Sequence, residues 1–351
     1  MSGLFVSLLS LLTVIRVIAI PLQAETRATD SWPDPICTGN CSYIHDPSVL
    51  QDSDGTYYRF STFAEIAIAT ASSLDGPWTY QGRALPQGSS IDLAGNTVLW
   101  APDVFGPFDD GSYIMYYAVS TSGSQDSDIG YATSTTLDPG SWTDGGSLGI
   151  PQDTAYNLID PNLLSVNFGD SYQLTFGSYW DDIYQVQLSD PPTSLASGAS
   201  PVHLEQNTTV RPDSLSTGPQ EGSYQFWWTV DDTVYYYLFF SSGACCNTPP
   251  DLVPAGEEYK VMVCRSTSAT GDFVDADGVD CLSDNGGTLV LGSHGDNVYA
   301  PGGQGVMYDD GVGSVVMYYH YVNPNIGYAA ADFLFGYNKL DFTSGWPVVV
   351  S

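Results

Sequence analysis

The sequence predicts an all-β fold, specifically a five-bladed β-propeller formed by residues 25–351. Within the repeated segments, large and small side chains alternate with period two, which is typical of strands. No segment shows a sustained helical period with caps. One pattern recurs five times: a turn, an aromatic strand, a small polar turn and a second strand, beginning at Gly55, Gly111, Asp170, Asp232 and Gly313. Five copies favour five blades around one axis. The alternative is a two-sheet sandwich.

Composition agrees with strands and turns and restricts the possible partners. Aromatic residues make up 13% of the chain and charged residues only 14%, a balance that favours strands over helices. The formal charge is -32, from 40 acidic and 8 basic residues. A field of that sign repels nucleic acid and anionic membrane surfaces. We therefore expect a neutral polymer as the partner, with neither nucleic acid nor membrane. We also expect the protein to be a monomer. The acids can also be explained simply as keeping a secreted protein soluble.

The N-terminal segment reads as an export signal. Residues 4–20 are mostly apolar with one charged residue, Arg16, and the stretch is too short and interrupted for a good membrane span. We predict a signal peptide over residues 1–24, ending at Ala24, and a secreted, extracellular protein. Two glycosylation sequons, at Asn40 and Asn207, suit that location.

All six cysteines follow the predicted signal peptide, and an even count in an exported chain suggests disulfides. Close spacing favours the pairs Cys37–Cys41 and Cys264–Cys281. The adjacent Cys245 and Cys246 are then either a vicinal pair or free. A zinc site is the weaker alternative, because no histidine lies at ligand spacing from any pair.

Each repeat is preceded by a segment that carries a carboxylate or a histidine. In a propeller the innermost strand of every blade faces one shared axis, so equivalent positions should converge on a single site. The Asp-Pro pairs at Asp46 and Asp160 could simply start turns, Asp103 could cap one, and Glu221 could be a solvated loop acid. Four acids at matching positions, in a chain with so few bases, favour a functional site. The residues concerned are Asp46, Asp103, Asp160, Glu221 and His294.

An ordered set of motifs resembles a known family. HDPSVLQDSDGTYYRFST, LWAPDVF, NLIDPNLL, FGSYW and EGSYQFWW together look like glycoside hydrolase family 43, and most closely its endo-arabinanases, with later segments similar to fungal members. The similarity runs from about His45 to the C-terminus. It implies a five-bladed propeller that cleaves internal α-1,5-L-arabinofuranosidic bonds of linear arabinan with inversion.

The resemblance also implies residue roles. Asp46 falls on the general base, Glu221 on the general acid, and Asp160 on the residue that orients the acid and raises its pKa. Inversion requires two carboxyl groups about 6.5–9.5 Å apart, with room for a water between one of them and the sugar.

Sugar recognition should combine polar groups with flat aromatic faces. By resemblance the substrate site is lined by Asn157, Gly123, Gly177, Ser178 and Tyr179. Trp100 and Trp180 are stacking candidates, unless they pack between blades.

One histidine is a candidate for a metal site. His294 corresponds to the family's axial histidine, where a structural calcium ion is expected, and the alternative is a core histidine. The segment HGDN around His294 has one residue more than the family pattern, which puts that ion site in doubt. Glu65 adds a further acid whose role the sequence does not define.

Two alternatives remain open. An exo-acting α-L-arabinofuranosidase or β-xylosidase of the same family would need a pocket closed by an extra loop or domain, and the sequence shows no β-sandwich after the fifth copy. A non-catalytic sugar-binding propeller would keep the tryptophans but would not need three acids.

Overall fold

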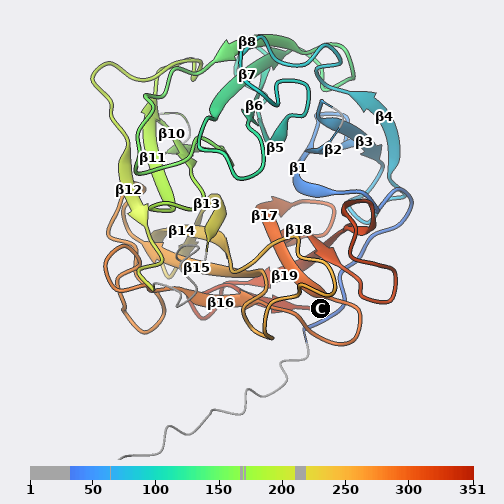
Figure 1. Cartoon of the computed structure of the whole chain (residues 1–351), viewed down its shortest axis with the longest axis vertical. Coiled ribbons are helices and arrows are strands. Elements are labelled where there is room, and N and C mark those ends of the chain that lie inside the picture. The colour runs from blue at the N-terminus through green and yellow to red at the C-terminus, as the bar shows by residue number, and fades with distance from the viewer. Residues whose placement is uncertain (1–31, 64, 167–168, 170, 210–218) are drawn as a thin grey trace, which may run out of the picture. The chain divides into compact units, whose positions relative to one another are not determined.

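In the computed structural model, residues 32–63, 65–166, 169, 171–209 and 219–351 are described, and the predicted signal peptide lies outside them. Strands of these residues form five four-stranded antiparallel sheets around a common centre (Figure 1). The first sheet contains β1 (His45–Gln51), β2 (Tyr57–Thr62), β3 (Ala67–Ala71) and β4 (Thr79–Arg83). The second contains β5 (Trp100–Phe105), β6 (Tyr113–Val119), β7 (Asp128–Ser134) and β8 (Thr143–Ser147).

The remaining three sheets follow the same pattern of consecutive strands. The third contains β9 (Asn162–Val166), β10 (Ser171–Phe176), β11 (Ile183–Leu188) and β12 (Val202–Glu205). The fourth contains β13 (Gln220–Val230), β14 (Thr233–Ser242), β15 (Lys260–Ser266) and β16 (Thr288–Leu291). The fifth contains β17 (Tyr299–Asp309), β18 (Ser314–Val322), β19 (Leu334–Asp341) and β20 (Val348–Val350). The prediction of a five-bladed β-propeller is confirmed.

The core lies between blades, and strand alternation explains it. In β6 all seven residues are buried, because each face of this second strand packs against a different neighbouring blade. Met115 and Tyr117 pack with Phe60 of the first blade, whereas Ile114 and Tyr116 belong to the cluster shared with the third. The aromatic side chains of the repeats therefore form the packing between blades. In a two-sheet sandwich only one face of each strand would have to be apolar.

The first and last blades share no strand among the described residues, and the ring is joined by packing and by the segment before β1. Backbone bridges connect Ile36 to Tyr337 of β19 and Gly39 to Trp78 of the first blade. The buried Arg59 guanidinium lies 4.7 Å from the ring centres of both Trp78 and Phe335. These contacts attach the fifth blade to the first.

All six cysteines are disulfide-bonded. The expected pairs Cys37–Cys41 and Cys264–Cys281 are present, and Cys245 is bonded to Cys246, which resolves the alternative that these two are free. The zinc alternative has no free thiolate to use. The described residues also contain no helix with the length and apolar character needed to span a membrane.

A β-bulge recurs near the first residues of the innermost strands, and it positions side chains that line the central cavity. In four blades the register between the innermost strand and its neighbour shifts near the start of that strand. One residue at each of these four shifts has a positive φ, and in the third blade, where the register does not shift, Asp160 has a positive φ just before β9. In four of the five blades proline follows this residue. Such a bulge redirects a side chain toward the strand's end. The residues are Asp46, Ala101, Asp160, Gly222 and Ala300.

The bulge corrects the expectation that four acids occupy matching positions. Asp46 and Asp160 are equivalent, but Glu221 lies one residue before its bulge and Asp103 lies two residues after its own. Asp103 instead accepts a hydrogen bond of 2.7 Å from the backbone N–H of Leu163, so it ties the second blade to the third. Burial raises its pKa to about 6.

Candidate active site

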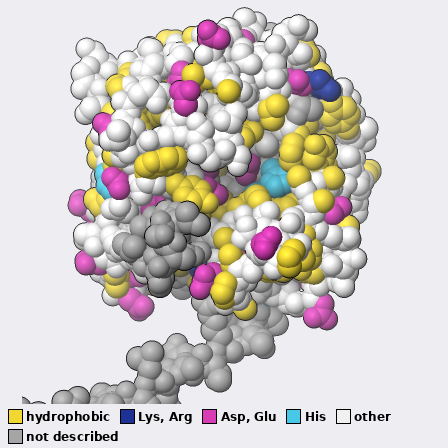
Figure 2. Space-filling view, in the orientation of Figure 1, with side chains coloured by type: hydrophobic (Ala, Val, Ile, Leu, Met, Phe, Trp, Pro, Cys, Tyr) yellow, Lys and Arg dark blue, Asp and Glu magenta, His cyan; other side chains and the backbone are white. Residues whose placement is uncertain are grey.

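A cavity of about 960 Å³ opens where the inner strands begin. Figure 2 shows this face hollowed near the centre of the ring, with acidic side chains and a histidine in the hollow and apolar side chains around it. The cavity is lined by all three predicted catalytic acids, Asp46, Asp160 and Glu221. Residues distant in sequence are therefore brought together as the propeller prediction required.

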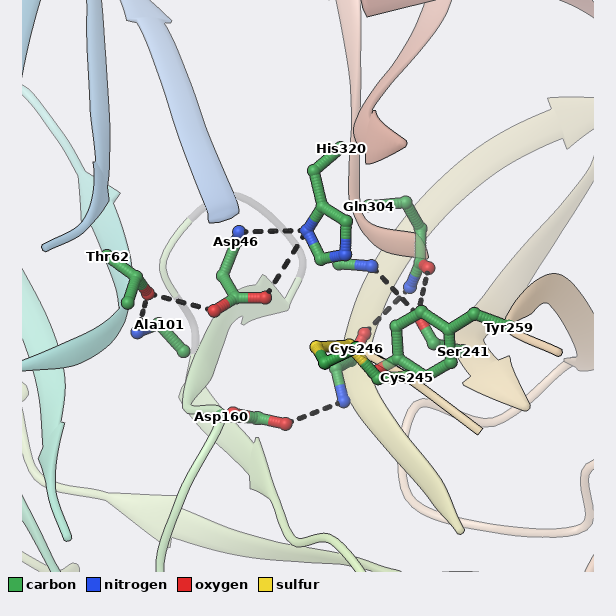
Figure 3. A network of polar contacts seen from close by, with 12 residues as sticks. Asp46, Thr62, Ala101, Asp160, Ser241, Cys245, Cys246, Tyr259, Gln304 and His320 are labelled. Carbon is green, nitrogen blue, oxygen red and sulfur yellow. Dashed lines mark hydrogen bonds and ion pairs between the residues drawn. A yellow bond between two sulfur atoms is a disulfide. The ribbon is translucent and has the colours of Figure 1, made fainter. Parts of the chain in front are cut away.

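Asp46 is held at its backbone and at one carboxylate oxygen (Figure 3). Its N–H donates to Nδ1 of His320 at 3.1 Å, and its Oδ2 accepts from the Thr62 hydroxyl at 2.8 Å. Thr62 Oγ1 in turn accepts from the N–H of Ala101 at 2.8 Å. Oδ1 lies 3.6 Å from Nδ1 of His320 and accepts no hydrogen bond from the described residues. Because the side chain is 32% exposed and lines the cavity, the carboxylate can accept a proton from a water.

His320 is a neutral support for Asp46. It is buried, and burial is the main reason that its pKa lies well below the usual value, with nearby His45 adding to the effect. Since Nδ1 accepts the hydrogen bond from the Asp46 backbone, the neutral ring carries its proton on Nε2. Burial likewise raises the pKa of Asp46, while His45 and the Thr62 hydrogen bond oppose that change.

Glu221 has a donor on each carboxylate oxygen. The Ser178 hydroxyl donates to Oε2, and the Tyr259 hydroxyl donates to Oε1 at 2.5 Å. Burial raises the pKa of Glu221; the two hydrogen bonds lower it, and the charge of Asp46 raises it further. A carboxyl group with a raised pKa and a fixed orientation suits proton donation.

Asp160 precedes β9 of the third blade, and its side chain reaches the backbone next to Glu221. Its Oδ2 accepts a hydrogen bond of 2.9 Å from the N–H of Gly222, so it fixes the backbone beside the acid. Burial and then the charge of Glu221 raise its pKa well above the usual value. The charge of Asp46 also raises the pKa of Asp160, because neighbouring like charges disfavour simultaneous ionisation.

A second layer fixes the inner strands of the fourth and fifth blades (Figure 3). Gln304 donates to the carbonyl of Gly222 at 2.7 Å and accepts from Ser241 at 2.8 Å. Gly303 has φ +56°, and a Cβ there would lie 2.7 Å from Oδ1 of Asp46 and from the His320 ring. Glycine is therefore required for Asp46 to approach this backbone.

Most predicted substrate-binding residues line the same cavity: Trp100, Gly123, Asn157, Ser178, Tyr179 and Trp180. Tyr179 and Trp180 are 41% and 37% exposed, so their rings are accessible. Asn157 is buried, and its Oδ1 has no hydrogen-bond partner among the described residues. The oxygen itself is not exposed to solvent, so a sugar hydroxyl could reach it only after the Asn157 side chain moved.

Gly177 is not among the lining residues. Its N–H donates to the carbonyl of Ile159 at 2.9 Å, and a Cβ would collide with the carbonyl oxygen of Asp182. Gly177 therefore allows its backbone to pack closely against Ile159 and Asp182 behind the cavity. It does not itself line the cavity.

The structure corrects the placement of His294. Its Nδ1 lies 2.8 Å from the carbonyl oxygen of Gly292 and its ring packs against Trp32, and it is not among the residues that line the cavity. The extra residue of HGDN is accommodated in a short turn closed by a bridge between His294 and Val298. The histidine that contacts Asp46 is His320, which the sequence analysis missed.

Glu65 also lies apart from the cavity lining. It forms a 2.8 Å ion pair with Arg83 of β4, which gives it a structural role at the outer part of the first blade. Tyr259 was likewise missed, because nothing near it in sequence marks it as a partner of Glu221.

Comparisons with known proteins identify the family of this chain. Residues 34–347 match the model of the family described as glycosyl hydrolases family 43. The chain is 51% identical to arabinan endo-1,5-alpha-L-arabinosidase A of Aspergillus niger over 340 residues, covering 96% of this chain and 99% of that protein.

Solved structures share the fold. An exo-1,5-alpha-L-arabinanase from a bovine ruminal metagenomic library superposes with a TM-score of 0.71 at 28% identity, over 88% of this chain and 97% of that one. A GH43 endo-arabinanase from Bacillus licheniformis superposes with a TM-score of 0.72 at 27% identity, over 90% of this chain and 100% of that one. The family match covers nearly the whole described chain and includes every residue of the site above, so the protein belongs to glycosyl hydrolase family 43.

Proposed function

We propose that this protein is a secreted arabinan endo-1,5-α-L-arabinosidase that hydrolyses internal bonds of linear arabinan with inversion. The names of its relatives support the substrate. The observation that carries the proposal is the pair of carboxyl groups, Asp46 and Glu221, contributed by different blades to one open cavity with exposed aromatic side chains.

In this scheme Asp46 is the general base. Its carboxylate accepts a proton from a water that attacks the anomeric carbon of the bound arabinofuranose. Thr62 and His320 keep the carboxylate in place, and because His320 is neutral it does not cancel the negative charge on Asp46. That charge is what makes the carboxylate a base.

Glu221 is the general acid and protonates the departing glycosidic oxygen. Ser178 and Tyr259 orient both of its oxygens. Asp160 holds the backbone at Gly222, and the negative charge of Asp46 disfavours ionisation of the acid. Asp46 and Glu221 come from the first and fourth blades, with the fifth between them in the ring, which favours the wider separation needed for a single displacement by water.

Substrate contacts follow from the cavity lining. Trp100, Tyr179 and Trp180 would stack on the apolar faces of successive arabinose residues, while Asn157 would accept a sugar hydroxyl after its side chain moves.

We further propose that the enzyme is exported by the signal peptide, glycosylated, and active as a monomer. Nucleic acid and membranes are not proposed partners.

The calcium ion near His294 stays a prediction, and the surroundings of His294 do not fit it. Calcium prefers several oxygen ligands, whereas the described residues contain no group of three or more His, Cys, Asp or Glu side chains able to hold a metal. No step of the mechanism depends on the ion.

Incubation with linear 1,5-arabinan, with products sized over time, tests the proposal. An open cavity that binds residues on both sides of the scissile bond should give mixed oligosaccharides early and a rapid fall in viscosity. Release of arabinose alone from the start would favour the exo-acting alternative, whose fold is the same. Absence of any product from arabinan would overturn the substrate assignment.

A further inference from the structure

The Cys245–Cys246 disulfide lines the catalytic cavity, beside Tyr259 (Figure 3). Of the disulfides in the described residues it is the one at the cavity, since Cys264 and Cys281 are buried in the hydrophobic cluster between the third and fourth blades. A bond between adjacent residues closes almost no chain, and the entropic stabilisation from a cross-link grows with the length of the loop it closes. Stabilisation of the fold therefore does not account well for this disulfide.

The backbone presents the disulfide at a defined position relative to the acid. After β14 the chain turns at Gly243, where φ is +107° and a Cβ would lie 2.6 Å from the carbonyl oxygens of Glu257 and Glu258. Ala244 then donates to the Glu257 carbonyl at 2.8 Å and accepts from the N–H of Tyr259 at 3.1 Å. The disulfide thus begins at the residue after Ala244, whose backbone is hydrogen-bonded to that of Tyr259. Tyr259 is the hydrogen-bond partner of Glu221.

Among the described residues, the fourth blade contributes no apolar side chain to the cavity lining other than the two cysteines and Tyr259. The exposed aromatic residues Tyr179 and Trp180 come from the third blade, and Trp100 comes from the second. The lining residues of the fourth blade are Glu221, Cys245, Cys246 and Tyr259, and the Tyr259 hydroxyl is bound to Glu221. Cys245 is half-buried and Cys246 is exposed, and both line the cavity.

We infer that the Cys245–Cys246 disulfide is a substrate-contacting surface, on which the arabinofuranose ring of the leaving group packs its apolar face. The general acid protonates the oxygen of the leaving group, and the disulfide belongs to the same blade as that acid, whereas the base Asp46 belongs to the first. Sulfur is polarisable and makes favourable contacts with apolar groups. This inference rests on the proposed function.

Two double variants test the contact. Cys245→Ser/Cys246→Ser replaces the sulfur surface with hydroxyls, and Cys245→Met/Cys246→Ser returns one apolar sulfur. With linear arabino-oligosaccharides, the first should raise KM roughly three- to tenfold, the size expected for losing a small apolar contact. The second should recover part of that loss. Because Tyr259 and Glu221 are unchanged, kcat and the basic limb of the pH–rate profile should stay near native values.

Reduction of the wild type with a phosphine should reproduce the rise in KM, and reoxidation should reverse it. Cys37→Ser/Cys41→Ser is the matched control, because that disulfide is remote from the cavity lining, and its KM should be native before reduction and rise equally afterwards. Native KM in the Ser/Ser variant would overturn the inference. A fall in kcat with a moved basic limb would also overturn it, since the disulfide would then act by holding Tyr259. A wild type inactive on these oligosaccharides would overturn the proposed function as well.

Discussion

Removal of the Tyr259 hydroxyl should move the basic limb of the pH–rate profile to higher pH. Tyr259 donates a 2.5 Å hydrogen bond to Oε1 of Glu221, and this bond favours the ionised acid and lowers its pKa. Activity on the basic side is lost as Glu221 loses its proton. In Tyr259→Phe the charged form is less stabilised, so Glu221 keeps its proton to higher pH.

The size of the change follows from the energy of the bond. A hydrogen bond to a charged group contributes about 1.5–3 kcal/mol, and about 1.4 kcal/mol corresponds to one pH unit. The basic limb of kcat/KM should therefore rise by about one to two pH units, while kcat falls because Glu221 is less well oriented. The Ser178 hydroxyl still orients the other oxygen, so the loss should be partial.

Steady-state kinetics on linear arabinan across the pH range provide the assay. Tyr237→Phe is a matched control, since this buried tyrosine of the same blade donates to the Gly345 carbonyl, far from the acid, and its limb should not move. An unmoved basic limb in Tyr259→Phe would show that the hydroxyl does not act on the ionising group. Movement to lower pH would contradict the assignment of Glu221 as the acid.

Three further predictions concern the acids, the backbone near Asp46 and the ring closure. Asp46→Ala and Glu221→Ala should each reduce kcat on arabinan by roughly 10²–10⁴-fold with a native circular dichroism spectrum; near-native turnover in either would refute its role. Gly303→Ala should reduce kcat at least tenfold, because its Cβ would displace the Asp46 carboxylate. Gly313→Ala is the control, since Gly313 also has a positive φ but has open space around it, and this variant should keep native kcat. Equal kcat values in the two variants would contradict the steric argument. Arg59→Ala should lower the free energy of unfolding in urea by about 2–4 kcal/mol, because it removes the side chain packed between Trp78 and Phe335. The exposed Arg83→Ala should change it by under about 1 kcal/mol, and similar losses in both would refute the role of Arg59 in closing the ring.

The fold and the three acids could be predicted from sequence because both depend on a repeated local pattern. Each aromatic copy is one pair of adjacent strands, and in a ring of such copies the segment before each must face the axis. The pattern did not show the bulge, so Asp103 was grouped with Asp46 although it lies deeper and serves as an inter-blade hydrogen-bond acceptor.

The supporting residues could not be predicted because their contacts are long-range. His320 is 274 residues from Asp46 and lies within an aromatic strand that resembles the core strands of the other blades. His294 lies in the segment before its aromatic repeat, as the acids lie before theirs, which makes it the better candidate from sequence. The extra residue beside it instead forms a turn away from the cavity lining.

The anomeric configuration of the first product tests the central claim most directly. If a water activated by Asp46 attacks in a single displacement, the new reducing end has the β configuration, inverted from the α bond of arabinan. Proton NMR of the reaction, recorded before mutarotation, distinguishes the anomers. The β anomer appearing first is the result predicted here. The α anomer appearing first would require Asp46 to act as a nucleophile with the carboxyl groups only about 5–5.5 Å apart, and would contradict the roles assigned to both Asp46 and Glu221.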